Sequence, residues 1–156
     1  MKKIMSLLLV ALFVSANTMV AHASRPVERP DIKINIGGQY INSDIPVIVI
    51  NNRALVPLRT VADGFNTQIS WNANARTVYL YIYGPTSGIV LYTNNPLIRT
   101  FDTYRGVKDY SRADVLEVGA TIINNRTYIP LRFFAEELGY AIHWCSDKYI
   151  YISRLQ

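Results

Sequence analysis

The chain has 156 residues, of which 50% are hydrophobic, and its 16 basic and 11 acidic residues give a formal net charge of +5. This length and apolar content allow one packed domain core, and the single cysteine, Cys145, excludes an intramolecular disulfide. The basic residues are scattered, with no Lys/Arg stripe interleaved with aromatic residues, which argues against nucleic-acid binding.

The N-terminal residues have the three parts of a secretory signal. Two lysines precede an apolar run over residues 4–14, and the small-residue site Ala-His-Ala follows at residues 21–23. We therefore predict a signal peptide over residues 1–23, the alternative being an uncleaved signal anchor. No run is long enough to span a bilayer, so we expect a secreted or cell-envelope protein with no transmembrane segment after cleavage. Without the two lysines, 14 basic and 11 acidic residues remain, a mild excess that would favour anionic envelope polymers weakly.

The next segments are predicted as a linker and a hairpin. Residues 24–31 contain prolines and charges, which predicts an extended linker. Apolar and polar residues then alternate over residues 32–36, reach Gly37 and Gly38, and resume, which predicts a β-hairpin. A similar pattern over residues 89–98 predicts a corresponding hairpin later in the chain.

One sequence phrase occurs twice, 73 residues apart. Residues 50–59 read Ile-Asn-Asn-Arg-Ala-Leu-Val-Pro-Leu-Arg, and residues 123–132 read Ile-Asn-Asn-Arg-Thr-Tyr-Ile-Pro-Leu-Arg. The similarity continues through the Ile-x-Trp sequences that end at Trp71 and Trp144. We infer that the chain contains two repeats, over residues 32–84 and 88–154.

Each repeat carries the same local signals. The Asn-Asn pair suits a two-residue type I′ turn between two strands, because asparagine tolerates positive φ. Pro57 and Pro130 follow, where a helix is expected to begin, and Asn66 and Gly139 can end these helices in the left-handed conformation.

A hairpin is expected after each helix. Trp71 and Trp144 would share a strand face with isoleucine and lie in the core, and the last strands would cover residues 77–83 and 149–153. These elements predict an α+β fold over residues 32–156. It would consist of two duplicated units, each an antiparallel sheet of hairpins curled around one helix, which share one compact body because either unit alone is too small.

The doubled phrase, followed by a hydrophobic-x-Trp sequence and a strand, resembles the copper amine oxidase N-terminal domain family, also called the stalk domain. The resemblance covers nearly all of the mature chain, and its departures are Asn66, Asn72 and Cys145, which replace the usual glycine and aspartates. The matching motif residues are Pro57, Arg59, Trp71, Pro130, Arg132 and Trp144.

The resemblance implies a protein without the oxidase catalytic domain. In the oxidases this domain is a non-catalytic appendage, remote from the copper and the quinone cofactor. The resemblance therefore implies no catalytic residues, no cofactor and no metal, and it points to exported proteins, often of Gram-positive envelopes.

The reactive side chains do not form a recognisable site in the sequence. Only His143 remains after removal of the signal, whereas a copper site of the usual type needs several imidazoles. No Ser/His/Asp arrangement has a recognisable context, and Cys145 is close to His143 only in sequence. We interpret His143 as an outward strand residue and Cys145 as a turn residue.

The acidic residues of the helices have two interpretations. Asp63, Glu136 or Glu137 could act as an acid pair in a wall hydrolase if two carboxylates faced each other across a cleft. Asp63 and Glu136 also follow Arg59 and Arg132 by four residues, so helix ion pairs are the simpler expectation. Arg59 and Arg132 oppose the helix dipole and are expected to cap carbonyls or to bridge the two units, with anion recognition as the alternative.

Tyrosines supply the main candidate binding residues. Tyr79, Tyr81 and Tyr83 are expected on one face of a strand, and Tyr149 and Tyr151 repeat the arrangement. Exposed rings could stack on sugars while their hydroxyls form hydrogen bonds. The alternative is that these rings are buried where the two sheets meet.

One charged segment, residues 102–114, breaks the repeat and is predicted as a long loop. Loops of this length in compact domains often carry function. Its candidate partner contacts are Tyr104, Arg105, Lys108 and Tyr110, and the alternative is a solvated loop without a partner.

The sequence thus predicts an exported, non-catalytic binding module of the cell envelope that recognises peptidoglycan or another wall glycan. The alternative is a protein-interaction or structural module that docks an exported protein. An enzyme such as a wall hydrolase is the third and least supported hypothesis.

Overall fold

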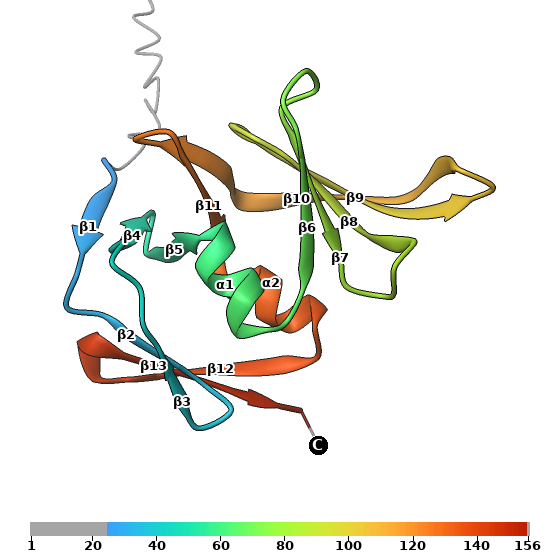
Figure 1. The fold of residues 1–156 in the computed structure, drawn as a ribbon. Helices are drawn as coiled ribbons and strands as arrows, with labels where there is room; N and C mark the ends of the chain where they lie inside the picture. Colours follow the sequence, from blue (N-terminus) through green and yellow to red (C-terminus); the bar gives the residue numbers. More distant parts are fainter. Residues whose placement is uncertain (1–24, 156) are drawn as a thin grey trace, which may run out of the picture.

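The computed structural model describes residues 25–155, and the predicted signal peptide lies outside this range (Figure 1). Within it the chain is mostly β-structure, with two seven-residue helices, α1 (Leu58–Gly64) and α2 (Leu131–Glu137). Neither these helices nor any other in the described part is long and apolar enough to cross a membrane. The strands before α2 are β1 (Val27–Arg29), β2 (Lys33–Ile36), β3 (Gln39–Ile41), β4 (Val47–Ile50), β5 (Arg53–Pro57), β6 (Gln68–Asn72), β7 (Thr77–Tyr81), β8 (Ser87–Tyr92), β9 (Asn95–Tyr104), β10 (Val107–Ile123) and β11 (Arg126–Pro130). After α2 come β12 (Tyr140–Cys145), the 3-10 turn η1 (Ser146–Lys148) and β13 (Tyr149–Arg154).

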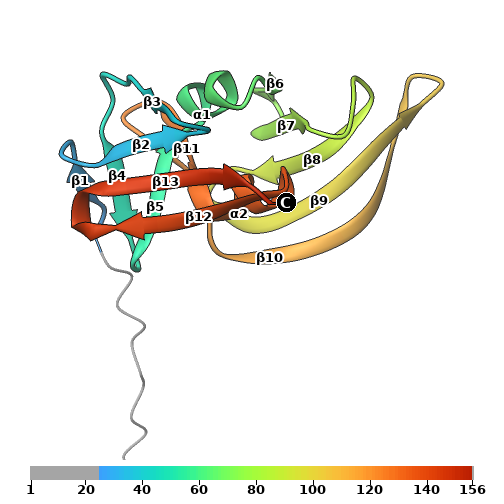
Figure 2. The ribbon, with the colours of Figure 1, turned by 90° about the horizontal axis from the view of Figure 1, so that it is seen from below.

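The strands of residues 25–155 form two sheets. One has nine strands in the order β1-β4-β5-β11-β10-β9-β8-β7-β6, and the other has four in the order β12-β13-β2-β3. The 17-residue β10 pairs with β9 along most of its length and with β11 at its end, and the register shifts between Val115 and Ala120. Beyond this irregularity, β9 and β10 extend together into a long curved hairpin (Figure 2).

The predicted α+β fold of two duplicated units, each a sheet curled around one helix, is wrong, because the described residues are mostly β-structure with two short helices and a nine-stranded sheet. The opening hairpin β2–β3 pairs with β13 of the second repeat, in parallel, with Ile34 opposite Ile150. The closing hairpin β6–β7 of the first repeat instead pairs with β8. Each repeat therefore gives strands to a sheet that the other repeat completes. A unit of about 60 residues buries little surface by itself, which is the physical reason for such an exchange.

The helices lie side by side between the four-stranded sheet and the β5–β11 part of the larger sheet (Figure 1). The ring of Phe65, just after α1, packs edge-to-face on Phe134 of α2 at 5.3 Å and on Tyr140 at 5.0 Å. The largest core cluster includes buried residues from both repeats, among them Ile34, Val56, Val61, Leu80, Ile89, Leu91, Ile129, Leu131, Phe134, Ile150 and Ile152.

The local predictions for the doubled phrase are confirmed. The Asn51-Asn52 turn has φ values of 48° and 59°, and the Asn124-Asn125 turn has 49° and 60°. Each helix begins directly after its proline, and positive φ values of 52° at Asn66 and 77° at Gly139 follow the helix ends. The two copies of the phrase therefore have the same local structure.

The segment 24–31, predicted as an extended linker, includes β1. This strand pairs with β4, with Val27 opposite Val49, and forms one edge of the nine-stranded sheet. Arg29, the last residue of β1, forms an ion pair with Asp31 at 2.8 Å.

The predicted loop over residues 102–114 is wrong, because these residues belong to the β9–β10 hairpin. Tyr104 pairs with Val107 across a two-residue turn, in which Arg105 has a φ of 50° and Gly106 a φ of 81°. These positive values suit the right-handed twist of a hairpin, and glycine adopts them at low cost.

Candidate functional site

The half of the nine-stranded sheet formed by β6–β10 has one face that points away from the main core. Residues directly opposite each other in antiparallel strands share a face. Tyr79 lies opposite Val90, which lies opposite Arg99, whereas Leu80, next to Tyr79, belongs to the main core. We call the face of Tyr79 the outward face. Its residues include Ser70, Thr77, Tyr79, Tyr81, Val90, Tyr92, Arg99, Phe101, Thr103, Lys108 and Tyr110.

A small second apolar layer covers this face. Phe101 is only 1% exposed although it is outside the main core cluster. The rings of Tyr79 and Tyr81 pack edge-to-face on it, with centroid distances of 5.3 and 5.4 Å. Edge-to-face packing of this kind stabilises beyond the area it buries. Tyr79 and Tyr81 are therefore half-buried side chains, and they are not sandwiched between the two sheets as the alternative interpretation required.

Lys108 reaches over these rings from β10. Its Nζ atom lies 4.9 Å from the ring centres of Tyr79 and Phe101 and 5.5 Å from that of Tyr81. The ammonium also donates a hydrogen bond of 3.4 Å to the Tyr81 hydroxyl. Cation–π attraction holds the ammonium over the rings. Among the residues that the structure describes, no carboxylate forms an ion pair with Lys108.

A second polar contact ties β7 to β10 on the same face. The hydroxyls of Tyr79 and Tyr110 lie 3.0 Å apart, and the guanidinium of Arg99 lies 5.6 Å from the Tyr110 ring centre. The hydrogen bond with Tyr79, together with desolvation, raises the pKa of Tyr110 to about 12. The Tyr110 phenol is therefore a neutral hydrogen-bonding group at physiological pH.

An open cavity of about 400 Å³ lies beside these groups. It is lined by Trp71, Tyr79, Tyr81 and Lys108, together with polar residues that include Ser70 and the asparagines of the β6–β7 turn. The prediction that Trp71 lies in the core is wrong, because it is 48% exposed. Its strand, β6, is the last strand of the sheet and has no neighbour on its far side.

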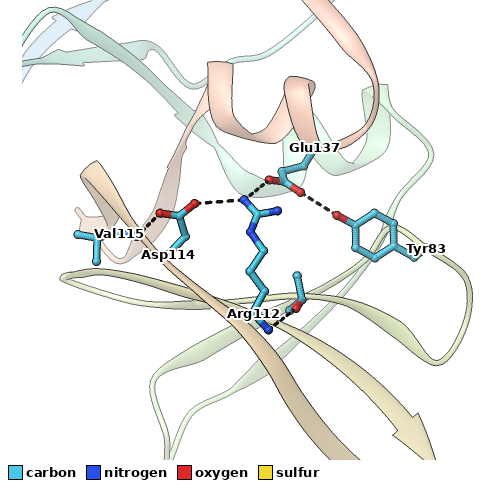
Figure 3. Close-up of polar contacts among 6 residues, drawn as sticks. Tyr83, Arg112, Asp114, Val115 and Glu137 are labelled. Atoms are coloured by element: carbon cyan, nitrogen blue, oxygen red, sulfur yellow. Dashed lines mark hydrogen bonds and ion pairs between the residues drawn. The ribbon is translucent and has the colours of Figure 1, made fainter.

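Tyr83 does not continue the row of Tyr79 and Tyr81, because β7 ends at Tyr81. Its hydroxyl donates a 2.7 Å hydrogen bond to Glu137 Oε2 of α2, and Arg112 lies 3.3 Å from Glu137 Oε1 (Figure 3). Arg112 also pairs with Asp114 at 3.1 Å. Burial and the hydrogen bond to Glu137 raise the pKa of Tyr83 to about 12. These contacts link α2 to the β7–β8 turn and to β10.

The other candidate tyrosines lie on the four-stranded sheet. Tyr149 and Tyr151 are exposed on β13, and the hydroxyls of Tyr151 and Tyr40 lie 3.2 Å apart. His143 is opposite Tyr151, and Cys145 is opposite Tyr149. The two predicted tyrosine groups therefore do not form one site, since they belong to different sheets.

The four candidate contact residues of the predicted loop also lie in two different places. Lys108 and Tyr110 lie on the outward face with Tyr79. Tyr104 and Arg105 lie at the hairpin tip, where Tyr104 is 70% exposed and the Arg105 guanidinium lies 5.3 Å from its ring centre.

The residues of the doubled phrase have structural positions. Pro57 and Pro130 are buried immediately before the helices. Arg59 and Arg132 are exposed, and within residues 25–155 neither forms the expected ion pair with Asp63 or Glu136.

The second tryptophan, Trp144, was also predicted in the core and is instead 44% exposed. It lines a small cavity of about 30 Å³ together with Arg53 and Arg132. Arg53 forms an ion pair with Glu117. The cavity is too small to hold a sugar ring, so Trp144 lacks the open space that adjoins Trp71.

The described residues do not fit a copper site. No group of three or more His, Cys, Asp or Glu side chains in residues 25–155 is placed to hold a metal ion. His143 is the only histidine in this part of the chain, whereas imidazole is the nitrogen ligand that copper sites require.

Sequence reasoning missed several residues of the outward face. Arg99, Phe101 and Thr103 alternate along β9 and all point to this face, and Tyr92 joins them from β8. The period-2 pattern of residues 97–103 was a usable signal, but it could be interpreted only once residues 102–114 were recognised as part of the same hairpin.

Comparisons with known proteins identify the family of this chain. The chain is 26% identical over 144 residues to a protein named "Protease inhibitor" from Brevibacillus choshinensis, a match that covers 89% of this chain and 39% of that protein. The chain thus spans about two fifths of the length of this relative. No solved structure matches. Residues 35–152, most of the chain, match the copper amine oxidase N-terminal domain. The chain therefore belongs to the copper amine oxidase N-terminal domain family of stalk-type modules, which lie outside the oxidase catalytic domain.

Proposed function

We propose that this protein is an exported, non-catalytic binding module of the cell envelope, and that the outward face binds an extended wall glycan such as peptidoglycan. One observation carries the proposal: Trp71, Tyr79, Tyr81 and Lys108 line a single open cavity beside polar turn residues. Aromatic rings offer apolar faces to sugar rings, and nearby hydroxyls and amides offer hydrogen bonds to sugar hydroxyls.

The form of the cavity favours a polymer over a small compound. At about 400 Å³ it has room for one or two sugar rings, and residues of the edge strand β6 and of the turn after it line one side. Trp71 lies opposite Val78, on the other side of the strand pair from Tyr79, but it is exposed at this sheet edge and lines the cavity from there. A chain of sugars could therefore enter and leave the cavity along the sheet edge.

Export is the part of the proposal that rests on the sequence alone. The predicted signal peptide supports a location in the envelope, and the mild excess of positive charge suits a partner with negative charge.

A sedimentation assay with purified cell wall tests the proposal, and the duplication supplies a matched control. Trp71→Ala and Trp144→Ala remove the same exposed side chain from equivalent positions of the two repeats. We expect Trp71→Ala to weaken retention at least about tenfold, as loss of a central aromatic contact does, and Trp144→Ala to retain wild-type binding. Equal retention of both variants, or no retention of the wild type at low salt, would contradict the proposal.

A second candidate function is docking to an exported protein through the tip of the β9–β10 hairpin. Tyr104 and Val107 are each 70% exposed there, an unusual exposure for large apolar side chains. Because the relative is named a protease inhibitor, the specific hypothesis is that the docked partner is a protease. Arg105 at the tip has the side chain that the acidic pocket of a trypsin-like protease binds.

Inhibition assays against a panel of secreted proteases test this second function. Inhibition by the wild type and its loss after Arg105→Ala would support it, with Arg76→Ala, in the β6–β7 turn, as the control. If the wild type inhibits no protease and replacement of the tip leaves co-purifying proteins unchanged, docking through the tip is wrong.

A further inference from the structure

We infer that the ligand of the outward face is an anionic glycan, and that Lys108 and Arg99 bind its negative groups. The inference rests on the proposed function and narrows its substrate class from sugars in general to sugars that carry carboxylate or phosphate groups.

The charged residues at the paired positions of the outward face are all positive. At the paired positions of β6–β10 this face carries Lys108 and Arg99 and no aspartate or glutamate. The nearby acids Asp102 and Asp109 lie opposite each other on the other face. A negatively charged ligand would therefore meet two cations and no carboxylate at these positions.

Three other basic side chains among the described residues form ion pairs. Arg29 pairs with Asp31, Arg53 with Glu117, and Arg112 with Asp114 and Glu137. Lys108 and Arg99 lie over aromatic rings, Lys108 also donates a hydrogen bond to one phenol, and within residues 25–155 neither forms an ion pair. Cation–π contact leaves a cation's charge uncompensated, so these two side chains retain the capacity to attract an anion.

Unsatisfied polar atoms also lie on this face. Within residues 25–155, the buried side-chain atoms without a hydrogen-bond partner are Thr77 Oγ1, Arg99 Nε and Thr103 Oγ1. All three residues point to the outward face by strand register. Buried polar groups are nearly always hydrogen-bonded in native proteins, so these three exceptions are groups that a bound partner could satisfy. The guanidinium and both hydroxyls can donate hydrogen bonds, which suits a ligand rich in acceptor oxygens.

The two cations are placed to act together. Lys108 lies over the Tyr79 ring, Arg99 lies over the Tyr110 ring, and the hydroxyls of these two tyrosines are in contact. A ligand with repeated negative groups could thus pair with both cations along one chain. Such pairing is screened by salt, which gives the inference a second readout.

Binding to three soluble probes, measured by isothermal titration calorimetry at low and high salt, tests the inference. The probes are a neutral chitin oligosaccharide, peptidoglycan glycan strands freed of phosphate polymers, and an isolated phosphodiester wall polymer. We expect at least one anionic probe to bind about tenfold more tightly than the neutral one at low salt, with the difference decreasing as salt increases. The second and third probes distinguish carboxylate from phosphate as the recognised group.

Three lysine variants test whether the effect belongs to Lys108 itself. Lys108→Met keeps the apolar stem over the rings but removes the charge, so we expect it to abolish the difference in affinity between the anionic and the neutral probes. Lys33→Met removes the same charge from the exposed surface of the other sheet and should bind like the wild type. Lys108→Arg should restore the preference.

The outcomes separate this inference from the proposed function. Equal affinity for neutral and anionic probes overturns the inference and leaves glycan binding intact. Equal losses in Lys108→Met and Lys33→Met also overturn it, because net charge would then be the cause. Failure of all three probes to bind overturns the proposed function itself.

Discussion

Val56 and Ile129 occupy equivalent positions of the doubled phrase, and in the structure they lie directly opposite each other across the β5–β11 pair. Leu55 faces Pro130 and Pro57 faces Tyr128, so the pairing follows a local two-fold relation between the repeats. Both Val56 and Ile129 are fully buried, and α1 and α2 each contact both strands of this pair. The doubled phrase thus supplies the contact that joins the two repeats at the centre of the fold.

Truncation at this contact should destabilise the whole domain. We expect Ile129→Ala to lower the free energy of unfolding by about 2–5 kcal/mol, because it deletes buried methyl groups and leaves a cavity. The Val56→Ala/Ile129→Ala double variant should depart from additivity, since the two side chains share one site. Urea unfolding of the variants measures both effects, with exposed Val115→Ala as a control that should change stability by less than about 0.5 kcal/mol. A small effect of Ile129→Ala would show that the central pair is dispensable.

Tyr83 should make stability depend on pH in the alkaline range. Its pKa is raised in the folded protein to about 12 from an ordinary value of 10.0, so folding favours the protonated phenol. This stabilisation is fully present below pH 10 and is lost as the pH rises toward 12. We expect thermal melting temperatures of the wild type to fall between pH 10 and 12 more steeply than those of Tyr83→Phe.

Glu137 supplies the partner that this pH dependence requires. Glu137→Gln retains an acceptor without the charge, so it should weaken the alkaline effect, whereas Glu137→Ala should reduce it further. Glu136→Ala, which removes the exposed neighbouring acid on α2, is the control and should behave as wild type. Identical pH profiles for Glu137→Ala and the wild type would disprove the role of this contact.

The second Asn-Asn turn should be sensitive to residues that resist positive φ. Asn125 has a φ of 60°, which glycine adopts freely and β-branched residues do not. We expect Asn125→Val to destabilise the protein by roughly 1–2 kcal/mol and Asn125→Gly to be close to neutral, measured by urea unfolding. Equal stability of the two variants would mean that the turn rearranges.

Phe101 should matter to stability although it lies outside the main core. Its burial under Tyr79, Tyr81 and Lys108 predicts a loss of about 3–5 kcal/mol for Phe101→Ala. Tyr104→Ala, at the exposed tip of the same hairpin, is the control and should cost little. Chemical unfolding measures the difference, and a small cost at Phe101 would show that the outward face is not a packed layer.

Local structure was predicted from the sequence more accurately than the pairing of distant strands. The Asn51-Asn52 turn and the helix that begins after Pro57 depend on φ preferences of the residues themselves, so they could be inferred directly. The parallel pairing of Ile34 with Ile150 depends on which distant strand completes the core, and the local alternation of isoleucines is compatible with several partners. The exchange of hairpins between repeats was therefore missed.

The candidate site was predicted in part for the same reason. Alternation correctly put Tyr79 and Tyr81 on one face, since side chains in a strand point alternately to its two sides. It also put Trp71 on the face of Ile69, but β6 became an edge strand, and an edge leaves a large ring exposed. Lys108 joined the site only through the long β9–β10 hairpin, whose Arg105-Gly106 turn was not recognised in the sequence.

The two tryptophans of the chain allow the most direct test of the central claim, that the outward face beside Trp71 is the glycan site. Trp144→Phe leaves only Trp71 as a reporter, and Trp71→Phe leaves only Trp144. Tryptophan fluorescence of each single-tryptophan variant is then recorded during titration with soluble peptidoglycan strands. The account predicts a saturable change in emission from Trp71 and none from Trp144. A saturable change from Trp144 alone would contradict it.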